Sequence, residues 1–270
     1  MKIGNKTFKD HTYIMGILNV TPDSFSDGGN FNNIDQALRH TEEMIRDGAD
    51  IIDVGGESTR LGYTLIPDDD EIERVCPVIE KIKENFDIPV SVDTYKHKVA
   101  EAAVKIGADL INDIWGFRYD NGEMAALAAK YSMPVCLMHN RKDTDYTDFL
   151  SDVTDDLAEC IKIARNAGLS DDLIMIDPGI GIGFAKSLEQ NLQLTQNLEV
   201  LDKLGFPILL GTSRKSMIGL SLNLPVTERL EGTLVTTVLA AQKNCLFVRV
   251  HDVKENKRAV TMTEKLMGKL

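Results

Sequence analysis

Eight short apolar runs recur along this chain, and each one ends abruptly in polar residues. An unbroken run of Val, Ile and Leu is typical of a strand buried on both faces, as in an all-parallel sheet. In a parallel barrel the carboxyl ends of all strands meet at one mouth, where enzymes of this architecture place their chemistry. The polar residues after the runs are therefore candidates for one common site. The runs cover residues 13–18, 51–52, 89–92, 110–111, 134–138, 173–176, 208–210 and 246–250.

Segments with helical periodicity separate these runs. Apolar positions recur at helical spacing from Ile34 to Ile45, and Gly48 follows as a stop. Strict alternation of strands and helices predicts the α/β class, and no glycine-rich dinucleotide fingerprint follows the first strand, which favours a single (β/α)8 TIM barrel. Residues 2–8, centred on Gly4 and Asn5, predict a short N-terminal hairpin. The other predicted helices begin after Pro67 or cover residues 96–106, 122–131, 152–167, 188–204, 229–243 and 254–267.

Length and composition predict one domain over residues 1–270. The chain has 270 residues, 43% of them hydrophobic, close to the roughly 250 residues of a typical single barrel. No linker interrupts the pattern, the start does not resemble a secretory signal, and no apolar run approaches the ~20 residues that cross a bilayer. No Cys-x-x-Cys pair occurs, so we expect free thiols and a cytoplasmic location. The cysteines are Cys76, Cys136, Cys160 and Cys245.

The net charge of −12 argues against a nucleic-acid partner, since phosphate backbones are bound by clustered Lys and Arg. It leaves room for a small anionic substrate, because a pocket can be cationic inside an acidic protein. The basic candidates all follow a predicted strand or end one. They are Arg60, Arg214, Lys215, Arg249 and His251.

Three polar residues interrupt or end apolar strands at positions where an unpaired polar side chain would be costly to bury. They are Asp93, Asn112 and Asp177. Any one of them could be satisfied by backbone or by a neighbouring Lys, but three converging on one mouth indicate a binding site. A carboxylate can accept hydrogen bonds from both the exocyclic amino group and the ring N–H of a pterin or guanine-like heterocycle.

A second set of candidates follows the last two strands. Residues 213–216 read SRKS and residues 249–252 read RVHD. The loops after strands seven and eight, with a helix N-terminus, are the habitual phosphate site of this fold. A solvated basic turn is the alternative. A second alternative is a Schiff-base role for Lys215, as in barrel aldolases, although the adjacent Ser and Arg suit anion binding better.

These segments together resemble the dihydropteroate synthase family over essentially the whole chain. The first two signatures are MGILNVTPDSFSDGG at residues 15–29 and DVGGESTR at residues 53–60. The ordered set is far more specific than any one motif. The remaining matches are SVDT (91–94), IND (111–113), MHN (138–140), DPG (177–179), SRKS (213–216) and RVHD (249–252).

The resemblance implies a transferase that joins 6-hydroxymethyl-7,8-dihydropterin diphosphate to p-aminobenzoate, releasing 7,8-dihydropteroate and diphosphate. It implies a dissociative, SN1-like mechanism in which Asp177 favours the cationic ring, and no covalent nucleophile. It also implies a Mg²⁺ ion near Asn19 and a homodimer formed through helices on one side of the barrel. The residues that it implies for the pterin ring are Asp93, Asn112, Asp177 and Lys215, with Met138 as an apolar wall.

The same resemblance assigns residues to the other two parts of the substrate pair. Arg249, with His251 and Asn19, would serve the diphosphate. Ser216, Lys215 and Phe184 would shape the p-aminobenzoate pocket. Two long loops, residues 19–33 and 55–67, would close over the site and exclude water. The residues implied for that closure are Phe25, Asp27, Thr59 and Arg60.

Two departures from the family pattern border the expected p-aminobenzoate pocket. Leu61–Gly62 stands where the family usually has Pro-Gly, and Leu leaves the loop backbone freer than Pro would. The run DPGIGIGFAK at residues 177–186 is two residues longer than the family pattern, as though Ile-Gly were duplicated. Both predict altered discrimination between p-aminobenzoate and sulfonamide mimics, with harmless loop variation as the alternative.

Two rival functions stay open. A methyltetrahydrofolate methyltransferase shares ring-binding carboxylates but does not need a diphosphate site, so Arg249 and His251 argue against it. A non-catalytic or sulfonamide-insensitive pterin-binding paralogue could carry the two departures, although the polar set is retained.

Overall fold

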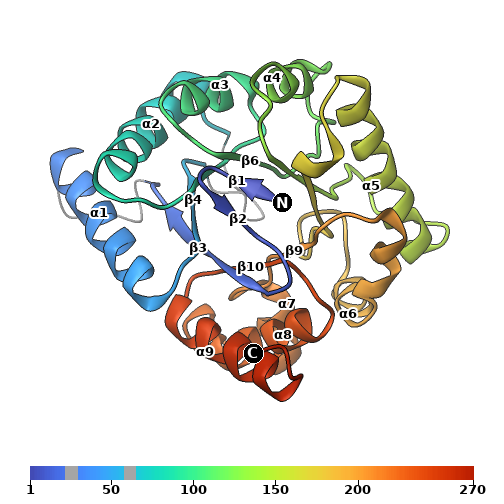
Figure 1. Cartoon of the computed structure of the whole chain (residues 1–270). Coiled ribbons are helices and arrows are strands. Elements are labelled where there is room, and N and C mark those ends of the chain that lie inside the picture. Colours follow the sequence, from blue (N-terminus) through green and yellow to red (C-terminus); the bar gives the residue numbers. More distant parts are fainter. Residues whose placement is uncertain (22–29, 58–64) are drawn as a thin grey trace.

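Parallel strands arranged around one axis form the centre of the molecule in this computed structural model, which describes residues 1–21, 30–57 and 65–270 (Figure 1). The order of hydrogen-bonded strands is β8-β7-β6-β5-β4-β3-β10-β9. A parallel bridge between Ile176 and Ile208 joins the two ends of this sheet, and the Ile176 N–H donates to Pro207 O at 2.9 Å. The predicted TIM barrel is thus confirmed. The strands are β3 (Tyr13–Asn19), β4 (Ile51–Gly55), β5 (Val90–Asp93), β6 (Leu110–Asp113), β7 (Val135–Met138), β8 (Ile174–Asp177), β9 (Leu209–Leu210) and β10 (Phe247–Val250).

Helices surround the barrel, as the periodicity predicted. The predicted helix over residues 188–204 is wrong in one respect, because it divides at Asn197 into an α-helix and a 3-10 helix. The helix after β9 was not predicted at all, since seven residues are too few for a periodic signal. The helices are α1 (Asn30–Asp47), α2 (Asp68–Asn85), α3 (His97–Lys105), α4 (Glu123–Tyr131), α5 (Phe149–Asn166), α6 (Leu188–Gln196), α7 (Ser216–Leu222), α8 (Leu230–Gln242) and α9 (Val253–Leu266), with 3-10 helices at Asp171–Leu173, Leu198–Leu204 and Val226–Glu228.

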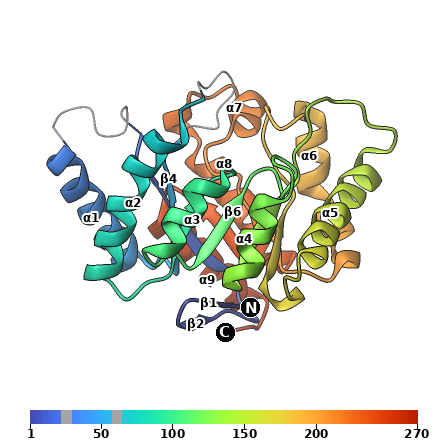
Figure 2. The ribbon, with the colours of Figure 1, turned by 90° about the horizontal axis from the view of Figure 1, so that it is seen from above.

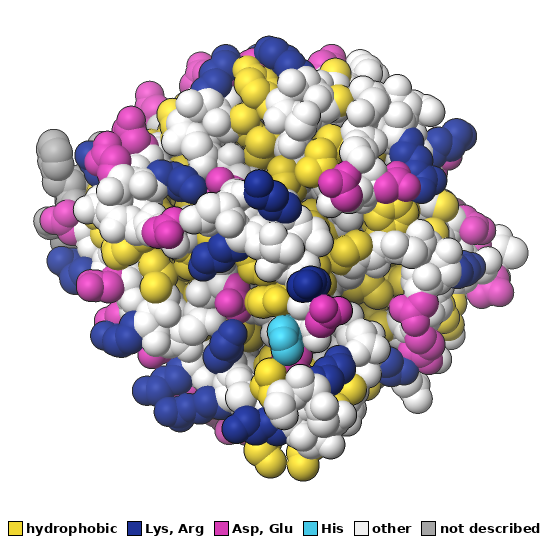
Figure 3. All heavy atoms as spheres, in the orientation of Figure 1, with side chains coloured by type: hydrophobic (Ala, Val, Ile, Leu, Met, Phe, Trp, Pro, Cys, Tyr) yellow, Lys and Arg dark blue, Asp and Glu magenta, His cyan; other side chains and the backbone are white. Residues whose placement is uncertain are grey.

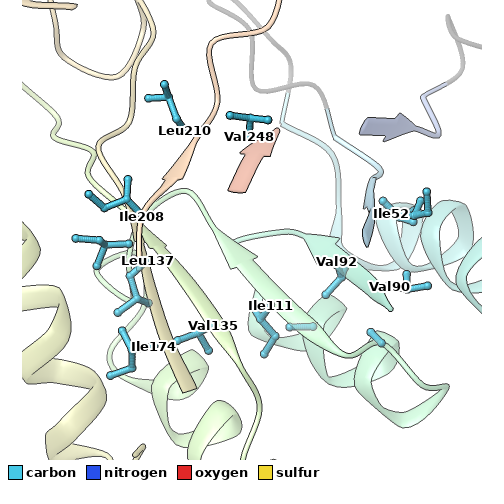
Figure 4. Close-up of a cluster of buried hydrophobic side chains, with 14 of the residues drawn as sticks. Ile52, Val90, Val92, Ile111, Val135, Leu137, Ile174, Ile208, Leu210 and Val248 are labelled. Atoms are coloured by element: carbon cyan, nitrogen blue, oxygen red, sulfur yellow. The ribbon is translucent and has the colours of Figure 1, made fainter. Parts of the chain in front are cut away.

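The strands bury side chains on both faces, which explains their unbroken apolar runs. Outward-facing residues pack against the ring of helices, and Figure 4 labels ten of them, including Ile52, Val92 and Leu137. Inward-facing residues such as Met15 and Phe247 form a second cluster, which fills the lower barrel. Burial of both faces makes the barrel a packed core rather than a pore.

The predicted N-terminal hairpin covers this lower end of the barrel. Its strands β1 (Lys2–Ile3) and β2 (Lys6–Thr7) pair antiparallel, and Gly4 adopts a left-handed φ of 56° at the turn. Phe8, just after the hairpin, packs on Phe247 at 5.0 Å between ring centroids. Figure 2 shows the hairpin and both termini at one end of the barrel and α7 at the other. Positive and negative side chains are interspersed over the hairpin end (Figure 3).

The four cysteines are free, as expected, and three of them are buried. None of the helices in the described ranges is long and apolar enough to cross a membrane.

Candidate active site at the carboxyl ends of the strands

Parallel register places the polar strand ends side by side on the inner wall of the barrel. Asn19 of β3 lies opposite Gly55 of β4, Gly55 opposite Asp93 of β5, and Asp93 opposite Asn112 of β6. On the other side, Met138 of β7 lies opposite Asp177 of β8. Because inward positions recur every second residue, these side chains lie directly above the apolar residues that fill the lower barrel.

Arg249 lies between two carboxylates at the centre of this wall. Its Nε contacts Asp53 Oδ2 at 2.5 Å, and its Nη2 contacts Asp93 Oδ2 at 2.6 Å. Asn112 Nδ2 donates to the same Asp53 oxygen at 3.2 Å. Burial raises the pKa of Asp93 and outweighs the opposing effect of Arg249, while the two carboxylates raise the pKa of Arg249 above its ordinary value. The barrel interior therefore holds a compact, charge-paired group rather than isolated charges.

Asp177 presents a third carboxylate on the opposite side. Its Oδ1 accepts a hydrogen bond from the Gly179 N–H at 2.6 Å. Gly211 lies next to both groups, since a Cβ there would be in ordinary contact, at 3.7 Å, with Asp177 Oδ2 and with Lys215 Nζ. Burial raises the pKa of Asp177, whereas Lys215 and Arg249 oppose that shift. The carboxylate and the Lys215 ammonium therefore both lie next to Gly211, with Arg249 close enough to act on the same pKa.

Lys215 is half-buried and supplies an amine beside Asp177. Its Nζ donates to Ile180 O and lies 5.3 Å from the centroid of the Phe184 ring. Burial lowers the pKa of Lys215 to about 8, although Asp177 acts in the opposite direction. Met138 belongs to a small apolar cluster, against which Phe184 packs. An apolar wall and a cation therefore stand together beside Asp177.

The rim of the site is built from the loops after β9 and β10. Ser213 Oγ accepts from the His251 N–H at 3.1 Å and lies 3.0 Å from His251 Nδ1. Arg214, which the sequence grouped with the anion-binding cations, instead pairs with Asp252 through Nε at 2.9 Å and through NH2. Ser216 is the first residue of α7.

Residues 15–251 match the model of the family described as pterin binding enzyme. The dihydropteroate synthase of Clostridium beijerinckii is 62% identical over 267 residues, 98% of each chain. That of Clostridium difficile, solved in the presence of pteroic acid, superposes with a TM-score of 0.93 at 50% identity and covers 97% of this chain and 98% of its own. The chain belongs to the pterin-binding enzyme family, as a dihydropteroate synthase.

Other members of this family show the same likeness. The enzyme of Xanthomonas albilineans, solved with 4-aminobenzoic acid, superposes with a TM-score of 0.90 at 42% identity and covers 96% of this chain and 94% of its own. The enzyme of Bacillus subtilis is 52% identical over 263 residues, covering 97% of this chain and 91% of that protein.

The structure brings most of the predicted site residues of this transferase to one mouth. Phe25, Asp27, Thr59 and Arg60 lie outside the described residues. The others gather at the carboxyl ends of the strands, in the loops directly after them or, for Ser216, at the start of α7, namely Asn19, Asp93, Asn112, Met138, Asp177, Phe184, Lys215, Ser216, Arg249 and His251.

Sequence reasoning missed two residues that belong to this group. Asp53 bridges Arg249 and Asn112, and its signal was available, because it ends the apolar run Ile51–Ile52 as Asp93 and Asp177 end theirs. Lys186 is buried in the loop after β8, and burial lowers its pKa to about 7. Nothing in the local sequence marks a loop lysine as buried.

Proposed function

We propose that residues 1–270 form one pterin-binding domain that condenses 6-hydroxymethyl-7,8-dihydropterin diphosphate with p-aminobenzoate, giving 7,8-dihydropteroate and diphosphate. The observation that carries this proposal is the pairing of acceptors and cations in one barrel mouth, with Asp177 facing Lys215 across Gly211. The relatives solved with pteroic acid and with 4-aminobenzoic acid support it.

In this proposal the pterin ring lies beside the Asp177 carboxylate. The carboxylate accepts from the ring N–H and the exocyclic amino group, a charge-assisted arrangement about twice as strong as neutral hydrogen bonds. Asn112 and Asp93 present an amide and a carboxylate from the neighbouring strands. Met138 forms the apolar wall. Lys215, in the loop after β9, is the cation that binds the ring.

The residues that bind the diphosphate are Arg249, His251 and Asn19. Asn19 ends β3 and is half-buried, and its Oδ1 lies 3.8 Å from where a Gly55 Cβ would stand. A carboxamide oxygen with access to water fits Mg²⁺, which prefers oxygen ligands and retains several waters. When bound there, Mg²⁺ neutralises charge on the diphosphate oxygens.

The reaction that we propose is dissociative. The bond between the pterin methylene and the diphosphate oxygen breaks first, and the ring delocalises the resulting cation. Asp177 stabilises that positive charge through a carboxylate already in place, which avoids reorganisation at the moment of reaction. The arylamine nitrogen then attacks the methylene and loses a proton. Ser216, Lys215 and Phe184 shape the p-aminobenzoate pocket.

One assay tests this function. The protein with both substrates and Mg²⁺ is expected to form dihydropteroate and diphosphate in equal amounts, and EDTA is expected to abolish product, because Mg²⁺ then no longer neutralises charge on the diphosphate oxygens. Chromatography of pterins and a diphosphate assay measure the two products. Binding of the pterin substrate without product would favour the non-catalytic paralogue. Methyl transfer from methyltetrahydrofolate would favour the methyltransferase.

We also propose a homodimer formed through α8 and α9. These two helices pack on each other and leave apolar side chains exposed, including Val235 at 69% and Leu266 at 77%. Exposed apolar side chains on two neighbouring helices are a surface that a second copy of the chain can cover.

The dimer is tested by light scattering after size exclusion. Val235→Glu is expected to yield monomers, because a carboxylate would be desolvated at the interface. Leu65→Glu, at a residue 61% exposed before α2, is the matched control and is expected to stay dimeric. A monomeric unmutated chain would refute the proposal.

A cytoplasmic location is likewise proposed, supported by the free thiols.

A further inference from the structure

The loop between β8 and α6, residues 178–187, is joined at both ends by the side chain of Asn191 in α6. Asn191 is completely buried. Its Oδ1 accepts from the Gly181 N–H at 2.6 Å, and its Nδ2 donates to Ser187 O at 2.7 Å and to Lys186 O at 3.4 Å. The carboxamide therefore uses both its acceptor and its donor group to join the two ends of this loop.

Contacts inside the loop leave little freedom to its backbone. Lys186 Nζ donates to Phe184 O at 3.1 Å, and the Phe184 N–H donates to Gly181 O at 3.3 Å. Gly179 has a φ of 68°, and a Cβ there would lie 2.0 Å from His139 O. Ala185 adopts a left-handed φ of 55°. The two residues that lengthen this loop relative to the family pattern lie within this network.

The network fixes where the Phe184 ring lies. A Cβ on Gly181 would stand 2.7 Å from Phe184 Cδ2, so the ring packs directly over the backbone that Asn191 holds. The Lys215 ammonium is a second neighbour of the ring, 5.3 Å from its centroid. A shift of Gly181 would therefore move Phe184 relative to Lys215, and both belong to the proposed p-aminobenzoate pocket.

We propose that Asn191 is a positioning residue that sets the affinity for the arylamine substrate by holding the residue 178–187 loop, and with it Phe184, in place. The inference rests on the proposed function. Asn191 contacts the loop backbone rather than the pterin side of the site, so its removal acts on one substrate more than on the other.

The experiment measures KM for each substrate and kcat in the full-length enzyme. Asn191→Ala is expected to raise KM for p-aminobenzoate about tenfold, the equivalent of losing one or two buried hydrogen bonds. KM for the pterin diphosphate is expected to stay within about twofold, because the contacts of Asp177 are left intact. Asn197→Ala is the matched control, since this half-buried Asn directly after the last residue of α6 donates through Nδ2 to Gln193 O, away from the residue 178–187 loop. An inactive unmutated enzyme would refute the proposed function instead.

A double-mutant cycle with Phe184→Ala separates positioning from a general loss of stability. If Asn191 acts through Phe184, then Asn191→Ala adds little to the KM for p-aminobenzoate in the Phe184→Ala background. Equal increases in both backgrounds, or equal increases in both KM values, would overturn the proposal. If Asn191→Ala does not fold, Asn191→Asp, which keeps the acceptor for Gly181 and loses the donor, is measured in the same cycle.

Discussion

Asp177→Asn is expected to lower kcat by about two to four orders of magnitude, while the protein stays folded. The amide has nearly the shape of the carboxylate and can still accept the hydrogen bond from Gly179. It carries no charge, so it cannot offset positive charge that develops on the pterin ring. It also leaves the Lys215 ammonium without the carboxylate that faces it across Gly211. Steady-state kinetics with saturating substrates measures the loss of kcat.

Asp113→Asn is the matched control for this variant. Asp113 is also completely buried at the end of a strand, but its oxygens accept from the Trp115 and Phe117 N–H groups, both at 2.8 Å, in the loop after β6. Asn can form one of these two bonds, and kcat is expected to stay within about fivefold because no charge is lost next to the ring. Near-normal kcat in Asp177→Asn would refute electrostatic stabilisation of the cation.

Lys96→Met is expected to lower the free energy of unfolding by about 3–5 kcal/mol, because it leaves two buried carboxylates without a counter-charge. Lys96 Nζ donates to Glu57 Oε2 at 2.7 Å, to Glu71 Oε2 at 2.8 Å and to Ile66 O at 2.8 Å. All three N–H groups are thus satisfied, and both carboxylates are at most 3% exposed. Burial raises the pKa of Glu71 despite this partner. Thermal unfolding is expected to show a Tm roughly 10 °C lower.

Lys81→Met on α2 controls for the substitution itself. Lys81 pairs with Glu84 at 2.6 Å, but both side chains are exposed, and exposed pairs of this kind contribute at most about 1 kcal/mol. Glu71→Gln combined with Lys96→Met is expected to recover part of the lost stability by removing one unpaired charge. Equal Tm values for Lys96→Met and Lys81→Met would contradict the role assigned to this cluster.

The barrel could be predicted from sequence because burial restricts which residues each of its strands can contain. A strand buried on both faces must be apolar throughout, so an Asp that ends such a run stands out, as Asp93 and Asp177 do. The same rule applies to Asp53, yet a carboxylate that pairs with an arginine inside the barrel is indistinguishable in sequence from one that faces a ligand.

Other features left no periodic signal. Helix α7 is too short, and the loop that holds Phe184 is stabilised by Asn191, a polar residue inside a helix. A buried Asn in such a position looks like any solvent-facing helical residue, since only its partners distinguish it. The burial of Lys186 likewise cannot be recognised from the sequence, because it depends on tertiary contacts.

The sequence by itself determined the alternation of strands and helices and the order of polar strand ends, because both follow from local burial and period. Tertiary structure alone decided which of these groups meet. Arg249 and Asp53 are 196 residues apart in the chain and 2.5 Å apart in space, and Lys215 approaches Ile180 across 35 residues. Such pairs depend on the closure and register of the whole barrel, which place strand ends in contact whatever their separation along the chain.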